Sequence, residues 1–213
     1  MSVTRPWGRF SSHDLDFASA DSAMGHTADL ALGIALAQPS RRVICLNGDG
    51  SMLMNLGTLV SIAGSGARNL TLFVLENGTY EITGNQSIPG AGIVDFPGLA
   101  LAAGFPRVYS FNRDVGYEAT LPEILALDGP IFVGVGVEPG SEGPISRSSR
   151  EESRYLQTSL AHSWRNSEKP LPSPKFGISA GDRVSPFSLR GLPFSYPPFG
   201  PIMVPRKNQT EEP

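Results

Sequence analysis

The chain has 213 residues, of which 40% are apolar, and a formal net charge of -3. This length accommodates one sizeable hydrophobic core, or one domain with an appendage. The slightly acidic charge balance, without any block of basic residues, argues against binding to nucleic acid or to an anionic membrane. The sequence contains no run of 18 apolar residues, so no membrane-spanning helix is predicted. Because the single cysteine, Cys45, lies inside an apolar run, we expect it to be a buried small hydrophobe in a cytoplasmic protein without disulfides.

Apolar runs alternate with helical patterns between residues 24 and 139. The strands read as short continuous apolar runs, and the helices as apolar residues at helical spacing. Continuous apolar strands are covered on both faces, so the alternation predicts an α/β fold with a parallel sheet and helices on both faces. In chain order the predicted elements are a helix at 24–38, a strand at 41–47, a helix at 51–66, a strand at 69–77, a helix at 95–105, a strand at 107–111, a helix at 116–127 and a strand at 130–139.

The composition changes near residue 167. Residues 167–213 contain 10 of the 19 prolines in 47 residues, and proline both removes a backbone donor and interrupts helices. We therefore predict an irregular, Pro-rich C-terminal extension there. Residues 1–19 show no strand–helix alternation and are interpreted as an N-terminal lead-in, which leaves 20–166 as the folded domain.

Two polar loops, 47–51 and 76–80, follow two successive predicted strands. Right-handed crossovers place both loops at the carboxyl edge of a parallel sheet, where ligands of such folds bind. If the two strands are adjacent, Asp49 and Asn77 face each other across that edge. A carboxylate, an amide oxygen and a nearby backbone carbonyl are hard oxygen ligands, suited to Mg²⁺ or Ca²⁺.

The helix predicted after the first loop adds a second feature. Its free amides near Ser51 would point at phosphate groups, and Gly50 would let the backbone approach them closely. Taken alone, a Gly-Asp-Gly sequence is more often a simple turn in which Asp49 is the N-cap of the following helix. The spacing favours a binding site over a simple turn, because 26 residues separate Gly50 from Asn77, which is the length of one helix and one strand.

Gly48-Asp49-Gly50, 26 residues and then Asn77 resemble the thiamine diphosphate motif of decarboxylases and their relatives. The flanking phrases "SAMGHTADLALGIALAQPSRRVICLNGDG" and "LENGTYEITGNQ" are similar to the phosphonopyruvate and sulfopyruvate decarboxylase branch of that family. The resemblance covers roughly residues 20 to 137. It implies the thiamine diphosphate-binding fold, here as the diphosphate-binding (PP-type) domain.

The resemblance also implies the residues of a thiamine diphosphate and Mg²⁺ site. Asp49 and Asn77 would bind the metal through their side chains, and Thr79 through its carbonyl oxygen. Thr83 and Gln86 would lie on a loop that covers the cofactor. The residues that would contact the cofactor are Met24, which would support its bent conformer, Gly25, His26, Gly48, Asp49, Gly50, Ser51, Asn77, Thr79 and Tyr80.

Several of these residues have an alternative interpretation. Met24 could be an ordinary core residue, and His26 a helix-start residue bonded to the backbone. Tyr80 and Glu81 could form a solvated turn. Glu76 stands where many family members have Asn and this branch often has Asp; the metal ligand would be the following residue, so we expect the substitution to be tolerated.

The resemblance implies that no catalytic residue lies in this chain. In the family, a glutamate on a separate pyrimidine-binding domain of about 150 residues activates the cofactor, and no matching pattern precedes Met24 or follows residue 140. We therefore expect a subunit of a 2-oxo acid decarboxylase for a phosphonopyruvate- or sulfopyruvate-like substrate, active in a homo- or hetero-oligomer with a pyrimidine-binding partner chain. The alternative is a truncated, non-catalytic cofactor-fold protein acting as an interaction module. A nicotinamide-dependent Rossmann enzyme is disfavoured, because Gly-x-Gly-x-x-Gly is missing from the first βα turn.

Overall fold

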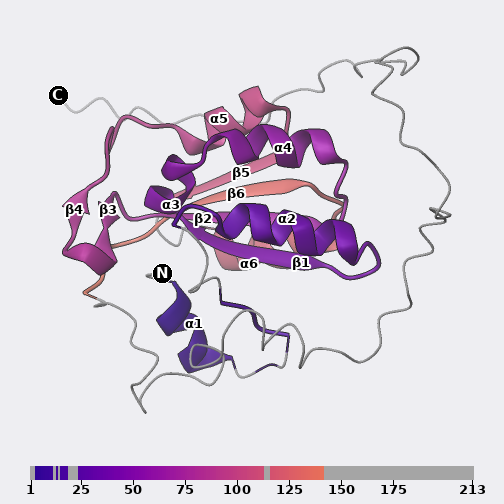
Figure 1. Cartoon of the computed structure of the whole chain (residues 1–213), viewed down its shortest axis with the longest axis horizontal. Helices are drawn as coiled ribbons and strands as arrows, with labels where there is room; N and C mark the ends of the chain where they lie inside the picture. The colour runs from indigo at the N-terminus through magenta and orange to yellow at the C-terminus, as the bar shows by residue number, and fades with distance from the viewer. Residues whose placement is uncertain (1–2, 12, 14, 19–23, 113–115, 142–213) are drawn as a thin grey trace, which may run out of the picture. The chain divides into compact units, whose positions relative to one another are not determined.

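The computed structural model describes residues 3–11, 13, 15–18, 24–112 and 116–141 (Figure 1). The predicted Pro-rich extension and the predicted domain end at residue 166 lie outside the described residues. The predicted lead-in contains a short helix, α1 (Thr4–Phe10), which the sequence patterns did not indicate. Among the described residues, no helix has the length and apolar character needed to cross a membrane.

A four-stranded parallel sheet forms the centre of the domain, in the order β1-β2-β6-β5. Its strands are β1 (Val43–Gly48), β2 (Leu70–Glu76), β5 (Arg107–Asn112) and β6 (Ile131–Gly136). The predicted parallel sheet is therefore confirmed, and the first two of its strands are adjacent, which is the condition for Asp49 and Asn77 to face each other. The two central strands, β2 and β6, are almost wholly buried, as continuous apolar sequences in a covered sheet should be.

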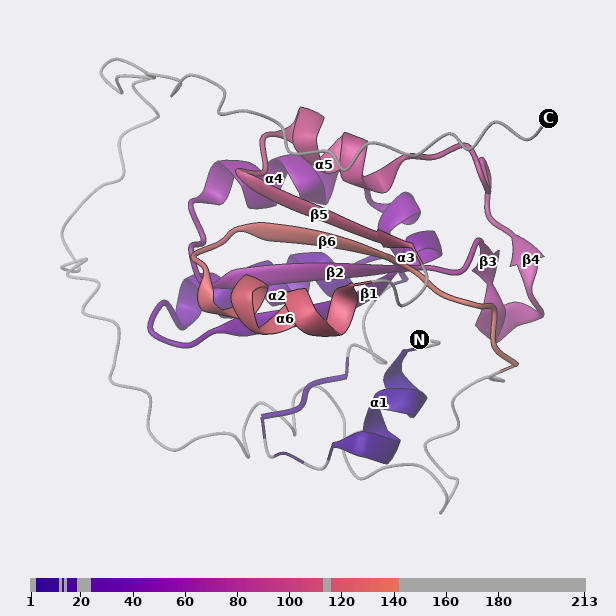
Figure 2. The ribbon, with the colours of Figure 1, turned by 180° about the vertical axis from the view of Figure 1, so that it is seen from behind.

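Helices cover both faces of this sheet, as predicted, but unequally. One face carries α2 (Thr27–Ala37), α3 (Asp49–Met54), α4 (Gly57–Ser65) and α5 (Phe96–Ala103), and the other carries α6 (Tyr117–Ala126) (Figures 1 and 2). Each face has its own apolar cluster. The helical side chains buried in the larger cluster are Ala28, Ala31, Ala35, Met52, Leu59, Ile62, Phe96 and Ala100.

Cys45 belongs to the larger cluster and is buried, which confirms its predicted role as a small hydrophobe. Its thiol group contacts the carbonyl oxygen of Thr27 at 3.8 Å. Burial raises the pKa of the Cys45 thiol to about 12, so the thiolate form is absent at neutral pH and the residue is chemically inert.

The prediction of one helix over 51–66 is wrong in its boundaries and its continuity. The helical segment begins at Asp49 and is divided into α3 and α4 by Asn55 and Leu56. Asn55 leaves the helical region, with φ -143° and ψ 60°, and its side-chain amide donates to Asp29 instead. Asparagine side chains compete with helices in this way, which period analysis does not detect.

A small antiparallel hairpin also escaped prediction. It pairs β3 (Thr79–Tyr80) with β4 (Gln86–Ser87), and the 3-10 turn η1 (Glu81–Thr83) lies between them. Two-residue strands are too short to show an alternating pattern. The hairpin follows β2 directly, so it lies at the carboxyl edge of the sheet.

Two glycines with open surroundings give a stability prediction. A Cβ atom added at Gly33 or at Gly66 would meet nothing within 4 Å, but Gly66 has a φ of +69° whereas Gly33 lies in the body of α2. We expect Gly33→Ala to raise the free energy of unfolding by about 0.5–1 kcal/mol. Gly66→Ala should lower it by about 1 kcal/mol, because an L side chain is strained at positive φ. Chemical denaturation of both variants measures this; changes of the same sign would contradict the assignment.

Candidate active site

The loops after β1 and β2 meet at the carboxyl edge of the sheet, through the carboxylate of Asp49. One oxygen of this group accepts a hydrogen bond from the backbone N–H of Gly50, and the other from the N–H of Gly78, both at 2.7 Å. The side chain is only 3% exposed. The N-cap interpretation of Asp49 is wrong: Gly48 occupies the N-cap position and Asp49 is the first residue of α3. Its carboxylate joins two loops instead of closing one helix.

The side-chain amide of Asn77 is oriented by two partners. Its nitrogen donates to a carboxylate oxygen of Glu81 at 3.0 Å, and its oxygen accepts from the backbone N–H of Thr79 at 3.0 Å. Glu81 is buried and also accepts from the N–H of Gly140 at 3.3 Å. The interpretation of Tyr80 and Glu81 as a solvated turn is therefore wrong for Glu81, which connects the second loop to the segment after β6.

The predicted covering loop forms its own hydrogen bonds. The hydroxyl of Thr79 donates to the side-chain oxygen of Asn85 at 2.9 Å, and the amide of Asn85 donates to the carbonyl oxygen of Gly140 at 3.0 Å. Thr83 donates to the side-chain oxygen of Gln86 at 2.9 Å, and both side chains are exposed. Thr83 and Gln86 thus lie on the outer part of the hairpin, beyond Asp49 and Asn77 in the fold.

Gly50 lies directly beneath Tyr80. A Cβ atom added at Gly50 would stand 2.6 Å from Cε1 of the Tyr80 ring and 3.2 Å from a methyl group of Ile88. No side chain larger than hydrogen fits there unless the hairpin moves. Tyr80 is half-buried, and its ring covers the backbone of Gly50.

Two carboxyl groups, those of Asp49 and Glu76, lie at this edge of the sheet. Burial raises the pKa of Asp49, although backbone hydrogen bonds from Gly78, Gly50 and Asn77 oppose the rise. Burial also raises the pKa of Glu76 to about 7, and the negative charges of Asp49 and Asp95 add to that rise. In the part of the chain that the structure describes, no Lys, Arg or His side chain pairs with Asp49 or Glu76. A divalent cation at this edge would relieve the repulsion.

The turn before α2 lies at the same edge of the sheet. Gly25 has a φ of +86°, and a Cβ atom there would stand 2.8 Å from Cβ of Met54 and 3.4 Å from the carbonyl oxygen of Ser51. Met24 is 62% exposed, so the interpretation as a core residue is wrong. The turn that carries Met24, Gly25 and His26 therefore packs against α3, the helix that begins with Asp49.

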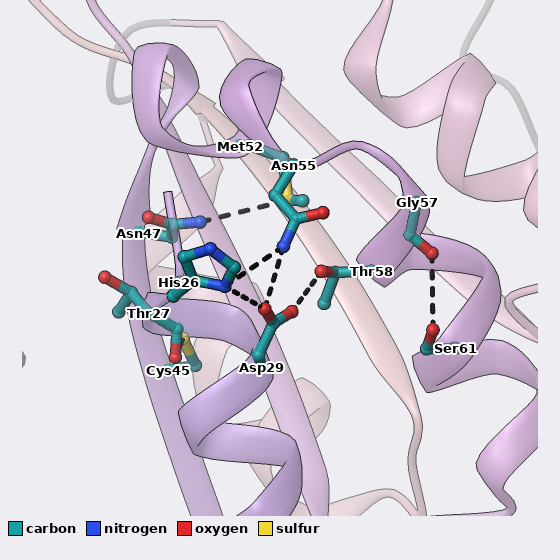
Figure 3. A network of polar contacts seen from close by, with 10 residues as sticks. All are labelled: His26, Thr27, Asp29, Cys45, Asn47, Met52, Asn55, Gly57, Thr58 and Ser61. Atoms are coloured by element: carbon teal, nitrogen blue, oxygen red, sulfur yellow. Dashed lines mark hydrogen bonds and ion pairs between the residues drawn. The ribbon is translucent and has the colours of Figure 1, made fainter. Parts of the chain in front are cut away.

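His26 directly precedes α2. The helix-start alternative required its side chain to bond to the backbone, but the side chain bonds to another side chain instead. Its Nδ1 atom lies 2.5 Å from a carboxylate oxygen of Asp29. Asn55 donates to that same oxygen at 2.8 Å, and the hydroxyl of Thr58 donates to the other one (Figure 3). Sequence reasoning missed Asp29, Asn55 and Thr58, because their partners are up to 29 residues away and share no motif.

An open pocket of about 420 Å³ lies beside this network, between α2 and α4. It does not include Asp49 or Asn77. Its lining residues are Asp29, Leu32, Asn55, Gly57, Thr58 and Ser61. Among the described residues, no group of three or more His, Cys, Asp or Glu side chains has the geometry of a metal site. A magnesium ion needs no such group, because it binds one or two carboxylates and completes its shell with water and phosphate oxygens.

The residues at the edge of the sheet fit a magnesium–diphosphate group. Asp49 is buried and ionisable, with backbone amides on both oxygens and no cationic partner among the described residues. Asn77 has a fixed side-chain oxygen. These are the hard oxygen donors that Mg²⁺ prefers. Gly50 follows Asp49 directly, and its backbone has no room for a side chain because the Tyr80 ring packs against it.

Comparison with known proteins identifies the family to which the chain belongs. Residues 11–135 match the family described as "Thiamine pyrophosphate enzyme, C-terminal TPP binding domain". The β subunit of sulfopyruvate decarboxylase from Methanothermobacter thermautotrophicus is 42% identical over 131 residues, which are 61% of this chain and 67% of that protein. Phosphonopyruvate decarboxylase from Streptomyces hygroscopicus is 34% identical over 164 residues, which are 76% of this chain and 40% of that protein.

Among solved structures, a thiamine diphosphate-dependent 4-hydroxybenzoylformate decarboxylase from Rhodococcus jostii RHA1 aligns with a TM-score of 0.46 and 28% identity, over 56% of this chain and 24% of that one. The family match covers more than half of the 213 residues. The chain therefore belongs to the thiamine pyrophosphate enzymes, and residues 11–135 are a C-terminal TPP-binding domain of that family.

Proposed function

We propose that this chain is the thiamine diphosphate- and Mg²⁺-binding subunit of a 2-oxo acid decarboxylase. The observation that carries the proposal is the Asp49 carboxylate, which is buried and bonded to the backbone of both loops and has no cationic partner among the described residues. Such a group is costly unless a cation accompanies it. The relatives named sulfopyruvate and phosphonopyruvate decarboxylase suggest a small 2-oxo acid with a phosphonate or sulfonate group as the substrate.

In this proposal, the residues of the chain bind and orient the reacting groups. Asp49, the side-chain oxygen of Asn77 and the carbonyl oxygen of Thr79 hold Mg²⁺. The backbone at Gly50 and Ser51 contacts the diphosphate. When bound, thiamine diphosphate supplies the carbanion chemistry that releases carbon dioxide from a 2-oxo acid.

The remaining predicted contacts surround the cofactor. Met24 projects from the turn beside α3 and supports the cofactor on its apolar side, and Gly25 and His26 line the same region. Gly48 and Tyr80 complete the cofactor contacts around the first loop.

A partner chain is part of the proposal. A relative that aligns over 67% of its length is named "subunit beta", which indicates an enzyme of more than one chain. We propose that a pyrimidine-binding partner supplies the activating glutamate and that the cofactor binds between the two chains, in a cytoplasmic oligomer. The second candidate, a non-catalytic interaction module of the same fold, predicts a stable chain that is indifferent to cofactor and metal.

Calorimetric titration of thiamine diphosphate into the full chain, co-expressed with a pyrimidine-domain partner, separates the two candidates. With Mg²⁺ present we expect saturable binding, and a hundredfold excess over the dissociation constant should stabilise the complex by about 2.7 kcal/mol, visible as a rise in melting temperature. Removing Mg²⁺ with EDTA should abolish that rise. A complex that neither releases heat nor changes its melting temperature would support the interaction module instead.

A further inference from the structure

The contacts of the Asp29 carboxylate determine where the proton of His26 lies. The Nδ1 atom of His26 is 2.5 Å from an oxygen of Asp29, and that oxygen also accepts from the side-chain amide of Asn55 at 2.8 Å (Figure 3). The other oxygen accepts from the hydroxyl of Thr58. An ionised carboxylate has no proton to donate, so the proton between His26 and Asp29 belongs to Nδ1.

The nitrogen of Asn55 lies 3.3 Å from the same ring nitrogen. It is itself a donor, so it cannot bond to an Nδ1 that carries a proton, and its bond goes to Asp29. With Nδ1 protonated, a neutral imidazole has an unprotonated Nε2 atom. The contacts around Asp29 therefore specify one of the two tautomers, and they leave Nε2 as a hydrogen-bond and proton acceptor.

The position of the His26 side chain leaves Nε2 available as an acceptor. Its side chain is 49% exposed, and the second ring nitrogen lies on the side of the ring away from Asp29 (Figure 3). The adjacent Gly25 packs against Met54 and against the carbonyl oxygen of Ser51, so the imidazole lies beside α3, the short helix whose first residue is Asp49. A histidine that served only to start α2 would not need a carboxylate held in turn by Asn55 and Thr58.

We propose that Asp29 is a positioning residue that holds His26 in its Nδ1–H tautomer. The Nε2 atom is then a proton acceptor at the cofactor edge, meaning the carboxyl edge of the sheet where the proposed cofactor site lies. When Nε2 takes a proton from an O–H or N–H group of a bound ligand, the electron pair of the broken bond stays on that ligand. The neutral ring becomes imidazolium, whose positive charge then pairs directly with Asp29. Asn55, in the break between α3 and α4, and Thr58, in α4, keep Asp29 in place. The catalytic part of this inference rests on the proposed function, whereas the tautomer itself does not.

The tautomer is measured in the full chain by long-range ¹H–¹⁵N NMR of the histidine rings, at a pH where imidazole is neutral. His13 is an internal control, because its Nδ1 accepts a hydrogen bond from the backbone N–H of Leu15 at 3.1 Å and must carry its proton on Nε2. We expect opposite patterns for His26 and His13 in one spectrum. An Nε2–H pattern for His26 overturns the proposal without any mutation.

Substitutions test whether Asp29 is the cause of the tautomer preference of His26. Asp29→Ala removes the charge-assisted hydrogen bond to Nδ1–H, so the ratio of Nδ1–H to Nε2–H at His26 should fall by roughly tenfold or more. Ser61→Ala is the matched control, because Ser61 lines the same pocket but bonds to the carbonyl oxygen of Gly57. If Asp29→Ala does not fold, Asp29→Asn gives the same test with a weaker acceptor, and an unchanged ratio in the folded variant contradicts the proposal.

A final measurement tests whether His26 and Asp29 lie at the proposed cofactor site. When calorimetry shows thiamine diphosphate and Mg²⁺ binding to the co-expressed pair of chains, the ¹⁵N resonance of Nε2 in His26 should shift, and that of His13 should not. Binding that leaves His26 unchanged overturns its role at the cofactor edge. Absence of binding overturns the proposed function instead, and the tautomer of the free chain still decides the positioning by Asp29.

Discussion

Asp49→Asn is expected to weaken Mg²⁺-dependent binding of thiamine diphosphate by at least about 100-fold. The variant keeps the size of the side chain but removes the only charged group that we assign to the metal. Even residues that merely support a metal ligand change affinity by about 10–100-fold when they are replaced. The neutral amide also cannot accept hydrogen bonds from both Gly50 and Gly78 in the way that the carboxylate does. Calorimetry with the full complex measures the loss.

Asp95→Asn is the matched control for this experiment. It makes the same chemical change at the same edge of the sheet, at an exposed N-cap whose oxygen accepts from the backbone N–H of Gly98 at 2.9 Å. Asparagine caps helices as well as aspartate does, so the affinity should stay within a few-fold of the wild type. Equal losses in both variants would mean that general charge at this edge matters, and not the position of Asp49.

Glu76→Gln is expected to stabilise the cofactor-free chain by about 1–2 kcal/mol at pH 8. The carboxyl of Glu76 is pressed against β6, where a Cβ atom added at Gly134 would stand 2.6 Å from its oxygen. Burial, and then the charges of Asp49 and Asp95, raise its pKa to about 7. The folded state thus holds this proton more tightly than the unfolded state. The gain is smaller than the full shift would give, because the side chain is only partly buried.

The upward shift of the Glu76 pKa on folding determines how the stability depends on pH. Below the ordinary glutamate pKa, the group is protonated in both states and the variant should match the wild type. As the pH rises from about 4.5 to about 7, the wild type loses stability because ionisation in the folded state is unfavourable, whereas glutamine does not titrate. The difference in melting temperature should therefore grow through this window and remain constant above it.

Glu123→Gln controls for the change of charge alone. Glu123 is exposed on α6, so its replacement should change stability by less than about 0.5 kcal/mol and without the same pH dependence. If the wild type and Glu76→Gln lose stability in parallel from pH 5 to pH 8, then the unfavourable ionisation of Glu76 in the folded chain is refuted.

The architecture was accessible from local sequence patterns. Val43–Gly48 and Leu70–Glu76 are short apolar runs between helical patterns, and the physics of covered parallel strands connects such runs to this sheet. The exceptions are local as well. The break at Asn55 and the hairpin of Thr79–Tyr80 depend on single side-chain hydrogen bonds and on strands of two residues, neither of which has a period.

The candidate site divides in the same way. The sequence by itself determined that Asp49 and Asn77 follow successive strands and lie at one edge of the sheet, because the direction and crossover of parallel strands place both loops there. The tertiary structure decided that the two strands are neighbours. Only the tertiary structure decided which groups surround Asp49 and Asn77. Glu81 orients Asn77, and Asp29 holds His26, through local side-chain contacts that no motif predicts. Asn55 and Thr58 in turn hold Asp29 from a part of the chain 26 and 29 residues away. Hydrogen bonds depend on distances of a few tenths of an ångström between atoms, and those distances are set when helices and loops pack, not by spacing along the chain.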